Sequence, residues 1–214
     1  MTRQGDAGLR DSGDLRLRRA VIESADALYY AHGFRAVGMD ALRQHAGVSL
    51  KLIYRLFPSK ESIVLAVLDY RHQIWAGEVT AAVERAESPR ERLLAIYDYL
   101  AGWFRAENFR GCVFINAFGE LATESPAVAA KAAEHKRDFR NYMDQLAIDA
   151  GFSAELGDQL MLLAEGAQVT AAITGDVSMA MKARRAAEML LSFEETRPTA
   201  SSAGGVGAPG SHGG

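Results

Sequence analysis

Apolar residues recur at helical spacing along nearly the whole chain between residues 15 and 195. The first predicted helix carries one apolar stripe at positions i, i+4, i+8 and i+11, made of Leu17, Val21, Ala25 and Leu28. No segment in this range reads as a strand with alternating apolar and polar residues. The pattern therefore predicts an all-α protein.

Two short helices are predicted after the first one. The second helix has Met39, Leu42 and Ala46 on its inner face and ends at Gly47, which supplies a turn. Ser49 follows the turn and can cap the third helix through its hydroxyl. This order of a supporting helix, a tight turn and a short recognition helix is typical of a helix-turn-helix DNA-binding motif.

The rest of the chain is predicted to hold longer helices. They begin at serine–proline or proline–serine steps, or end at glycine, as helices commonly do. The pattern places one from Pro58 to about Glu84, one from Ser88, one from Ser125 to about Ala150, and two more at 153–174 and 178–194. The last two are separated by a very short turn, so we expect them to be antiparallel neighbours.

The charge is distributed unevenly along the chain. The net formal charge of the 214 residues is −3, which by itself argues against a DNA-binding protein. Residues 1–75 carry 11 Lys and Arg against 8 Asp and Glu, or +3, whereas residues 76–214 carry 13 against 19, or −6. This small excess of basic residues in the N-terminal part supports a nucleic-acid-binding domain there, followed by a domain with another role.

The cysteine count and the hydropathy pattern indicate a cytoplasmic protein. Cys112 is the only cysteine, which excludes an internal disulfide and fits a reducing compartment. No apolar run approaches the roughly 18 residues that a membrane span needs. The N-terminal residues have no hydrophobic segment, so we expect no secretory signal and no membrane association.

Four short motifs follow one another between residues 31 and 61: Ala31-x-Gly33-Phe34, Ala46-Gly47-Val48-Ser49, Ile53-Tyr54-x-x-Phe57 and Pro58-Ser59-Lys60-Glu61. In this order they make the chain resemble the TetR family of bacterial transcriptional regulators. The resemblance is strongest from Val21 to Leu65 and continues weakly through the body, where Gly111-Cys112 with Asn116-Ala117 is similar to one C-terminal subgroup.

The resemblance implies an all-α homodimer with an N-terminal three-helix helix-turn-helix domain and a C-terminal helical domain for ligand binding and dimerisation. It also implies repression that a small-molecule effector relieves. We accordingly divide the chain into a flexible N-terminal arm at 1–14, a DNA-binding domain at 15–61, an effector-binding and dimerisation domain at 62–195 and a disordered, Gly/Ser/Ala-rich tail at 196–214. No cofactor and no metal site is expected.

The third predicted helix supplies most of the expected DNA contacts, because a recognition helix presents its N-terminal residues to the base edges. Lys51 can donate to guanine or phosphate, Leu50 can pack on a thymine methyl group, and Arg55 can reach either a base or a phosphate. Lys60 lies at a helix N-terminus, which attracts phosphate. The full expected set is Gly38, Ser49, Leu50, Lys51, Tyr54, Arg55 and Lys60.

The chain departs from the family at two of these contacts. Tyr54 matches the family's phosphate-contacting tyrosine, but Gly38 stands where a capping Ser or Thr is usual and brings no hydroxyl. Leu56 stands where a histidine is common. Ile53 is expected in the core, and Leu52 either in the core or on the surface.

Five arginines near the N-terminus are either arm contacts to DNA or a solvated face: Arg3, Arg10, Arg16, Arg18 and Arg19.

An aromatic-rich stretch after residue 97 is the candidate effector pocket, with polar anchors from later helices. Aromatic residues at helical spacing are also what a plain core contains, and both interpretations stay open for each residue. Glu165 and Gln168 stand out because a polar group in an apolar run needs a partner or an outward position. The candidates are Tyr97, Trp103, Phe104, Cys112, Phe114, Asn116, Phe118, Tyr142, Met143, Met161, Glu165 and Gln168.

The last two predicted helices are the candidate dimer interface, because they are similar to the family's dimerising pair. Small residues allow helices to approach closely, and longer apolar residues add buried area. The expected interface comprises Gly166, Ala167, Thr170, Ala171, Met179, Leu190 and Leu191. A dimer would present two recognition helices to successive major-groove turns, which predicts a pseudo-palindromic operator.

Three alternatives to a ligand-responsive repressor were weighed. An enzyme is disfavoured because the histidines show no pattern with Cys112 and no phosphate loop or nucleophile elbow is present. A helical dimeric interaction protein with weak or lost DNA binding stays open, given the apolar third helix. A thiol sensor at Cys112 also stays open, although Val113 and Phe114 beside it suggest burial.

Overall fold

The structure, a computed structural model, describes the backbone of residues 3–197 and the side chains of residues 13–197. Within that range it contains nine α-helices and no strand, so the all-α prediction is confirmed. The helices are α1 (Arg3–His32), α2 (Met39–Ala46), α3 (Leu50–Leu56), α4 (Lys60–Glu84), α5 (Pro89–Trp103), α6 (Val113–Leu121), α7 (Pro126–Asp149), α8 (Ala154–Thr174) and α9 (Met179–Thr196).

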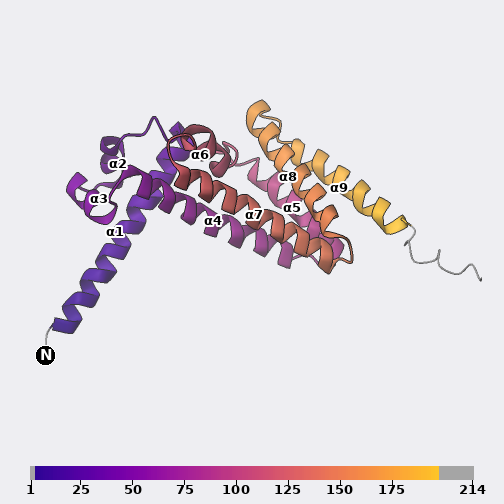
Figure 1. The fold of residues 1–214 in the computed structure, drawn as a ribbon, viewed down its shortest axis with the longest axis horizontal. Coiled ribbons are helices and arrows are strands. Elements are labelled where there is room, and N and C mark those ends of the chain that lie inside the picture. The colour runs from indigo at the N-terminus through magenta and orange to yellow at the C-terminus, as the bar shows by residue number, and fades with distance from the viewer. Residues whose placement is uncertain (1–2, 198–214) are drawn as a thin grey trace, which may run out of the picture.

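The helices form a small head and an elongated body (Figure 1). Helices α1, α2 and α3 make up the head, and α4 runs from the head into the body alongside α7. Helices α5, α8 and α9 complete the body at the far end, and α6 lies where α1 meets α7. No helix among residues 3–197 is long and apolar enough to cross a membrane.

Serine caps begin most of the helices. Five serine hydroxyls each accept a hydrogen bond from a backbone N–H in the first turn of the helix that follows. These serines are Ser49, Ser59, Ser88, Ser125 and Ser153. Each cap satisfies an N–H group that has no carbonyl partner inside the helix. Proline in the first turn of α5 and α7 adds to this, since its fixed φ suits a helix start.

The turn between α2 and α3 depends on the backbone conformation of Gly47. Its φ of 65° and ψ of 26° lie in the left-handed region, and its N–H donates to the carbonyls of Arg43 and Gln44. A residue with a Cβ is disfavoured in this conformation. Val48 and Ser49 then lead directly into α3, so the glycine sets the angle between the two helices of the motif.

Two differences from the predicted domain limits appear. Helix α1 begins at Arg3, so residues 3–14 are helical where a flexible arm was expected. The segment contains no proline, which would break a helix, and its three glycines weaken the helix without preventing it. The predicted disordered tail lies outside the described residues from 198 onward, and Thr196 itself is the last residue of α9.

The head does not have a core of its own. The buried cluster that holds α1, α2 and α3 together also includes residues of α6 and the start of α7, at Val113, Phe114, Ala117, Val128 and Ala132. A second cluster fills the body between α4, α5, α7, α8 and α9. The packing boundary therefore does not follow the chain boundary predicted at residue 61.

A pair of glycines can test the role of the turn. We expect Gly47→Ala to lower the free energy of unfolding by about 1 kcal/mol, because alanine is strained at a positive φ. Gly77→Ala, in the interior of α4, should raise it by roughly 0.5–1 kcal/mol. A Cβ would meet no atom within 4 Å at either position, so backbone conformation alone separates the two. Urea unfolding at a fixed protein concentration measures both, and equal effects would contradict this account.

Candidate nucleic-acid interface and ligand cavity

Helix α3 buries one flank and exposes the other. Ile53 is fully buried in the head core, as expected from the sequence, and Phe57 anchors the residue just after the helix. On the opposite flank Lys51, Tyr54 and Arg55 are exposed, with Tyr54 retaining 49% of its accessible surface. A short helix fixed by one apolar side can thus present its other side to a partner.

The three leucines of α3 lie between these two flanks. Leu50, Leu52 and Leu56 are all half-buried, so Leu52 belongs fully to neither the core nor the surface. Arg18 secures the end of the helix, because its Nη1 donates to the carbonyl of Leu56 at 2.8 Å and its guanidinium lies 4.1 Å from the centre of the Phe57 ring. Arg18 is therefore engaged inside the head.

Two of the three cationic contacts expected at or near α3 have partners in the structure. Arg55 Nη2 lies 2.6 Å from Asp14 Oδ1, and both side chains are exposed. An ion pair in water contributes little, so a phosphate can compete for this guanidinium. Lys60 is different: its ammonium is half-buried and donates to the carbonyl of Phe34 at 2.6 Å.

The ammonium of Lys60 is turned inward, toward the Phe34 carbonyl, and its expected contact with a DNA phosphate stays a prediction. The Phe34 carbonyl follows the end of α1 and receives its hydrogen bond from the ammonium. Partial burial lowers the pKa of Lys60, opposed by the negative charge of Glu120. The lysine thus joins α4 to the segment after α1.

Gly38 and Ser49 mark the N-termini of α2 and α3. Gly38 is the N-cap of α2 with an extended backbone and no side-chain cap, and a Cβ there would meet no atom within 4 Å. The Ser49 hydroxyl already accepts from the Leu52 N–H at 3.2 Å. Both residues are exposed and lie at helix starts, where N–H groups point outward.

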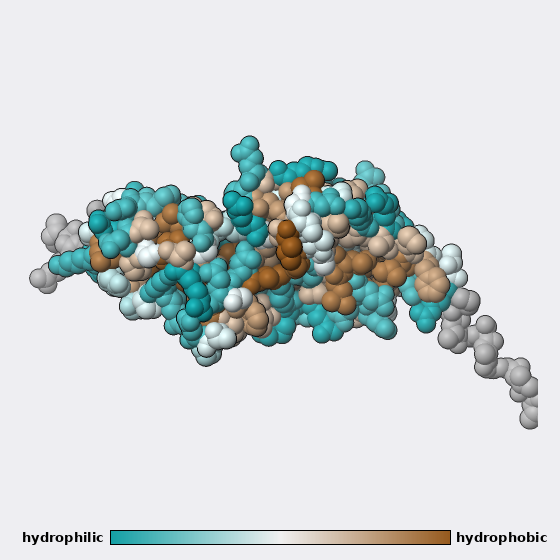
Figure 2. All heavy atoms as spheres, turned by 90° about the horizontal axis from the view of Figure 1, so that it is seen from above, coloured by the Kyte–Doolittle hydropathy of each residue, from teal (hydrophilic) through white to brown (hydrophobic). Residues whose placement is uncertain are grey.

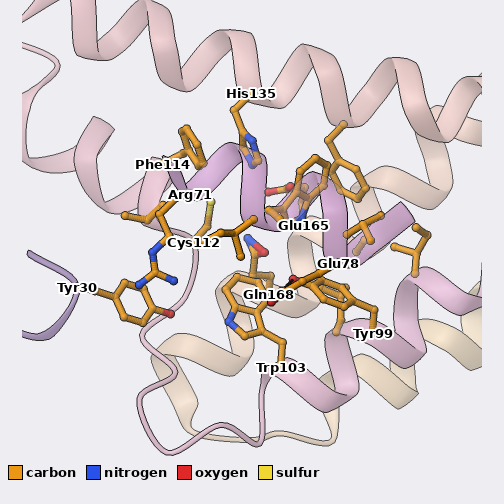
Figure 3. A pocket seen from close by; sticks show the side chains of 18 residues that line it. Tyr30, Arg71, Glu78, Tyr99, Trp103, Cys112, Phe114, His135, Glu165 and Gln168 are labelled. Atoms are coloured by element: carbon orange, nitrogen blue, oxygen red, sulfur yellow. Dashed lines mark hydrogen bonds between the residues drawn. The ribbon is translucent and has the colours of Figure 1, made fainter. Parts of the chain in front are cut away.

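A cavity lies where the head meets the body. The empty space among its wall residues totals about 690 Å³, part of which is continuous with the solvent. Its walls come from α1, α4, α5, α7, α8 and the start of α6. Figure 3 shows Tyr30 and Arg71 at one end of the cavity and Trp103, Tyr99 and Glu78 at the other. Among the sequence-based candidates the cavity is lined by Trp103, Cys112, Phe114, Glu165 and Gln168.

The other seven pocket candidates lie elsewhere. Tyr97, Phe104 and Met143 are buried in the body core, and the Tyr97 hydroxyl donates to the carbonyl of Leu160 at 2.7 Å. Phe118 is exposed on α6, retaining 53% of its surface. The three remaining candidates are half-buried outside the cavity: Asn116, Tyr142 and Met161. Aromatic density in the sequence did not show which face of each helix is turned toward the cavity.

Several lining residues were missed, and the largest group of them lies on α4. Arg71, Trp75 and Glu78 fall at i, i+4 and i+7 along α4 and line the same wall. Such a mixed polar and aromatic stripe on a long helix is a signal that sequence analysis can use. The missed residues are Tyr30, Arg71, Ile74, Trp75, Glu78, Val79, Ile96, Tyr99, Leu100, Val113, His135, Phe139 and Ala164.

Two of the three charged side chains that line the cavity, Arg71 and Glu165, are in ion pairs. Arg71 forms an ion pair with Asp26 of α1, and its guanidinium lies 4.6 Å from the centre of the Tyr30 ring. Burial raises the pKa of Asp26, against the opposing effect of the Arg71 charge. On the other side, Lys136 Nζ lies 2.7 and 2.6 Å from the two carboxylate oxygens of Glu165.

His135 is neutral at physiological pH because of its surroundings. Its ring stacks on Phe114 with a centroid separation of 3.7 Å, and its Nδ1 lies 3.1 Å from the His72 Nδ1. Burial, followed by the charge of Lys136 and then His72, lowers its pKa from 6.5 to about 3. The ring thus serves as an uncharged wall of the cavity.

Cys112 is buried and precedes the first residue of α6. The ammonium of Lys136 lies 3.6 Å from its sulfur. Burial agrees with what its apolar neighbours suggested, and the thiol-sensor hypothesis stays a prediction. Within the described side chains no cluster of three or more His, Cys, Asp or Glu residues has the arrangement of a metal site.

Three of the seven dimer candidates on α8 and α9 are turned toward the core of the chain, and the other four are at least partly accessible. Ala167, Ala171 and Leu191 are buried in the body core of a single chain, so they cannot form an outer surface. Their helices approach other helices of the same chain closely, which explains the small side chains. Gly166 is exposed, and Thr170, Met179 and Leu190 are half-buried.

A different face of α8 and α9 is apolar and exposed. Leu162 and Ile173 on α8 retain 68% and 78% of their surface, and Met189 and Phe193 on α9 retain 74% and 63%. Figure 2, which looks onto the molecule from above, shows apolar side chains gathered along the body toward the C-terminal end. We call Leu162, Val169, Ile173, Met189 and Phe193 the outer apolar face. Exposed apolar side chains gathered in this way often mark an interface.

Two family models match the chain. The model described as "Bacterial regulatory proteins, tetR family" covers residues 21–67, and the model described as "Tetracyclin repressor-like, C-terminal domain" covers residues 89–187. The first spans the head and the start of α4, and the second spans most of the body.

Curated relatives and solved structures agree with the models. The chain is 32% identical over 92 residues to the HTH-type transcriptional regulator BetI of Rhizobium meliloti, covering 43% of this chain and 44% of that protein. It is 27% identical to the HTH-type transcriptional repressor ComR of Escherichia coli, covering 60% and 64%. The matched part thus spans less than two thirds of the length of these curated relatives.

Among solved structures, the fold is similar to a TetR-family transcriptional regulator from Streptomyces coelicolor, with a TM-score of 0.75 and 25% identity over 83% of this chain and 95% of that one. A second regulator, from Streptomyces avermitilis, gives a TM-score of 0.74 and 27% identity over 85% and 99%. The order of head and body helices is therefore shared along almost the full length of both structures.

The buried histidine makes stability depend on pH. In the unfolded chain His135 takes up a proton as the pH falls through 6.5, whereas in the folded chain it stays neutral down to about pH 3. The unfolded state therefore binds more protons in this window, and the free energy of unfolding should fall as the pH is lowered from 6.5. We expect His135→Phe to flatten this slope between pH 6.5 and 4.5 in urea unfolding. The exposed His45→Phe serves as the control, and a slope that His135→Phe leaves unchanged would contradict the assignment.

Proposed function

Because this chain belongs to the TetR family of bacterial regulatory proteins, we propose that it is a homodimeric DNA-binding transcriptional repressor that a small-molecule effector releases from a pseudo-palindromic operator. The observation that carries the proposal is the exposed flank of α3. Helix α3 is held by the buried Ile53 on one side and begins at a turn capped by Ser49. Its other side leaves Lys51, Tyr54 and Arg55 exposed on the outside of the head. A helix held in this way fits the major groove.

Each group on this flank has a proposed part in DNA binding. Lys51 and Arg55 donate to base edges or phosphates, and Leu50 packs against a thymine methyl group. Tyr54 donates through its hydroxyl to a phosphate. Near Gly38 and Ser49, the N-terminal N–H groups of α2 and α3 provide further phosphate contacts.

The proposed dimer uses the outer apolar face. Pairing two copies across a two-fold axis would cover Leu162, Ile173, Met189 and Phe193, which water otherwise surrounds. The two α3 helices would then read half-sites about one helical turn apart, roughly 34 Å. The relatives include the transcriptional repressor ComR, and we propose that this chain also represses transcription.

The proposed effector site is the cavity at the junction of head and body. Tyr30 lines it from α1, and its hydroxyl donates to the Gly111 carbonyl and accepts from the Arg110 N–H, both at 2.9 Å. Arg71 lines it from α4 and pairs with Asp26 of α1. A ligand that displaces either side chain changes how α1 and α4 are held, and with them the position of α3.

A second candidate function is a helical interaction protein with weak or lost DNA binding. It is favoured by the three half-buried leucines of α3 and by the inward direction of Lys60. Fluorescence anisotropy with labelled duplexes from the DNA upstream of the protein's own gene separates the two. Saturable binding that a scrambled duplex does not reproduce supports the repressor, and equal or absent binding supports the alternative.

Lys51→Ala tests the DNA-binding flank. We expect it to weaken operator binding about tenfold, and to reduce the slope of log K against log salt by about one if the lysine contacts a phosphate. If the lysine reads a guanine instead, the loss should depend on the base at that position. Arg85→Ala, exposed at the far end of α4, is the control. Losses of the same size in both variants would mean that only net charge matters.

Ile173→Glu tests the outer apolar face. A carboxylate there should oppose the pairing of two copies, so we expect a shift from dimer to monomer in sedimentation velocity and a loss of cooperative operator binding. Ile148→Glu, at an exposed isoleucine of α7 that keeps 51% of its surface, should leave the dimer intact. A dimer that survives Ile173→Glu would place the interface elsewhere.

A further inference from the structure

One polar group in the cavity has no partner. Gln168 retains only 6% of its surface, and within the described residues its Nε2 atom makes no hydrogen bond. Figure 3 shows its amide in the middle of the cavity, surrounded by Glu78, Tyr99, Trp103 and Glu165. A buried donor without an acceptor is unfavourable, so this amide is a place where a bound molecule would gain a hydrogen bond.

The charged groups around the amide are already engaged. Arg71 is paired with Asp26, and Glu165 with Lys136. The Glu78 carboxylate accepts from the Tyr99 hydroxyl at 3.0 Å and is exposed to water. An anion would therefore have to break an existing pair or lose its own hydration without a new partner. A cation would find only the water-exposed carboxylate of Glu78, and an ion pair with an exposed group contributes little. An uncharged ligand needs no charged partner.

The walls around the amide are aromatic. Trp75 and Phe139 meet edge to face with a centroid separation of 5.3 Å, and Tyr99 and Trp103 are stacked at 6.3 Å. Phe114 completes the lining on the side of α6. Aromatic side chains arranged in this way favour a flat ring as their occupant, through stacked and edge-to-face contacts.

We propose that the cavity binds an uncharged, flat aromatic compound that carries a carbonyl oxygen, and that this oxygen accepts a hydrogen bond from the Gln168 amide. The role of this compound as the effector rests on the proposed function, whereas its chemical class rests on the cavity alone. The donor at Gln168 selects for the oxygen, and the paired charges select against ionised groups.

Four single-ring probes of similar size separate the possibilities. Acetophenone is uncharged and has the carbonyl, ethylbenzene lacks the oxygen, benzoate is an anion and benzylammonium is a cation. Both tryptophans of the chain line the cavity, so their indole N–H resonances report binding in an NMR titration of the full chain without DNA. We expect saturable shifts with acetophenone and a dissociation constant about fivefold to tenfold lower than with the other three. Equal or tighter binding of benzoate or benzylammonium, or no saturable shift with any probe, overturns the proposal.

A variant isolates the amide. Gln168→Met keeps the length of the side chain but removes the donor, so acetophenone should bind it no more tightly than ethylbenzene, whose own affinity should not fall. Gln159→Met, at an exposed position of the same helix, should behave as the wild type. If acetophenone keeps its advantage in Gln168→Met, the amide is not the donor. If that variant does not fold, the ranking of the four probes on the wild-type chain still decides.

The same probes distinguish failure of this proposal from failure of the repressor function. Operator anisotropy is measured with and without saturating acetophenone. A chain that binds acetophenone in the expected order but binds no operator refutes the repressor and leaves the ligand class standing. A chain that binds its operator but not acetophenone refutes the ligand class alone.

Discussion

The hydrogen bonds and the ion pair between α1 and the body are the interaction on which the rest of this molecule depends. The Tyr30 hydroxyl is bonded to both Gly111 and Arg110, and Asp26 is paired with Arg71 of α4. These contacts are partly buried, so breaking any of them leaves a polar group without a partner in a region that water reaches poorly. They fix α1, and α1 carries the second and third helices of the head. The position of α3 is therefore determined at a site that lies at the opposite end of α1 from the DNA-binding surface.

The same contacts form one end of the cavity. Tyr30 and Arg71 are both wall residues and structural anchors, so a molecule that enters competes with contacts that hold the head in place. The ligand would act directly on side chains that hold α1, so no series of intermediate residues is needed between the cavity and α3. A ligand shifts the head only by as much as it binds one arrangement better than another. The paired charges and the neutral His135 mean that this difference must come mainly from packing and from a few hydrogen bonds.

The sequence alone predicted the helices and the DNA-reading motif, because both depend on local rules. Serine caps, Gly47 and the burial of Ile53 follow from nearest-neighbour chemistry and from apolar spacing. The cavity and the outer apolar face were predicted less well. Helices such as α8 are apolar on more than one side, so spacing could not tell Ala167, which faces the core, from Ile173, which faces water. The inward contact of Lys60 was not foreseen for a related reason, since its acceptor on Phe34 lies 26 residues away in the chain.

The shared core of the head has a consequence for engineering. Val113, Phe114 and Ala117 of α6 and Val128 and Ala132 of α7 complete the packing around α1, α2 and α3. Fusing only the first sixty residues to a foreign sensor would leave the apolar undersides of these helices without a cover. A chimaeric regulator built from this chain must therefore keep α6 and the beginning of α7 together with α1, α2 and α3. These segments are not continuous in the sequence.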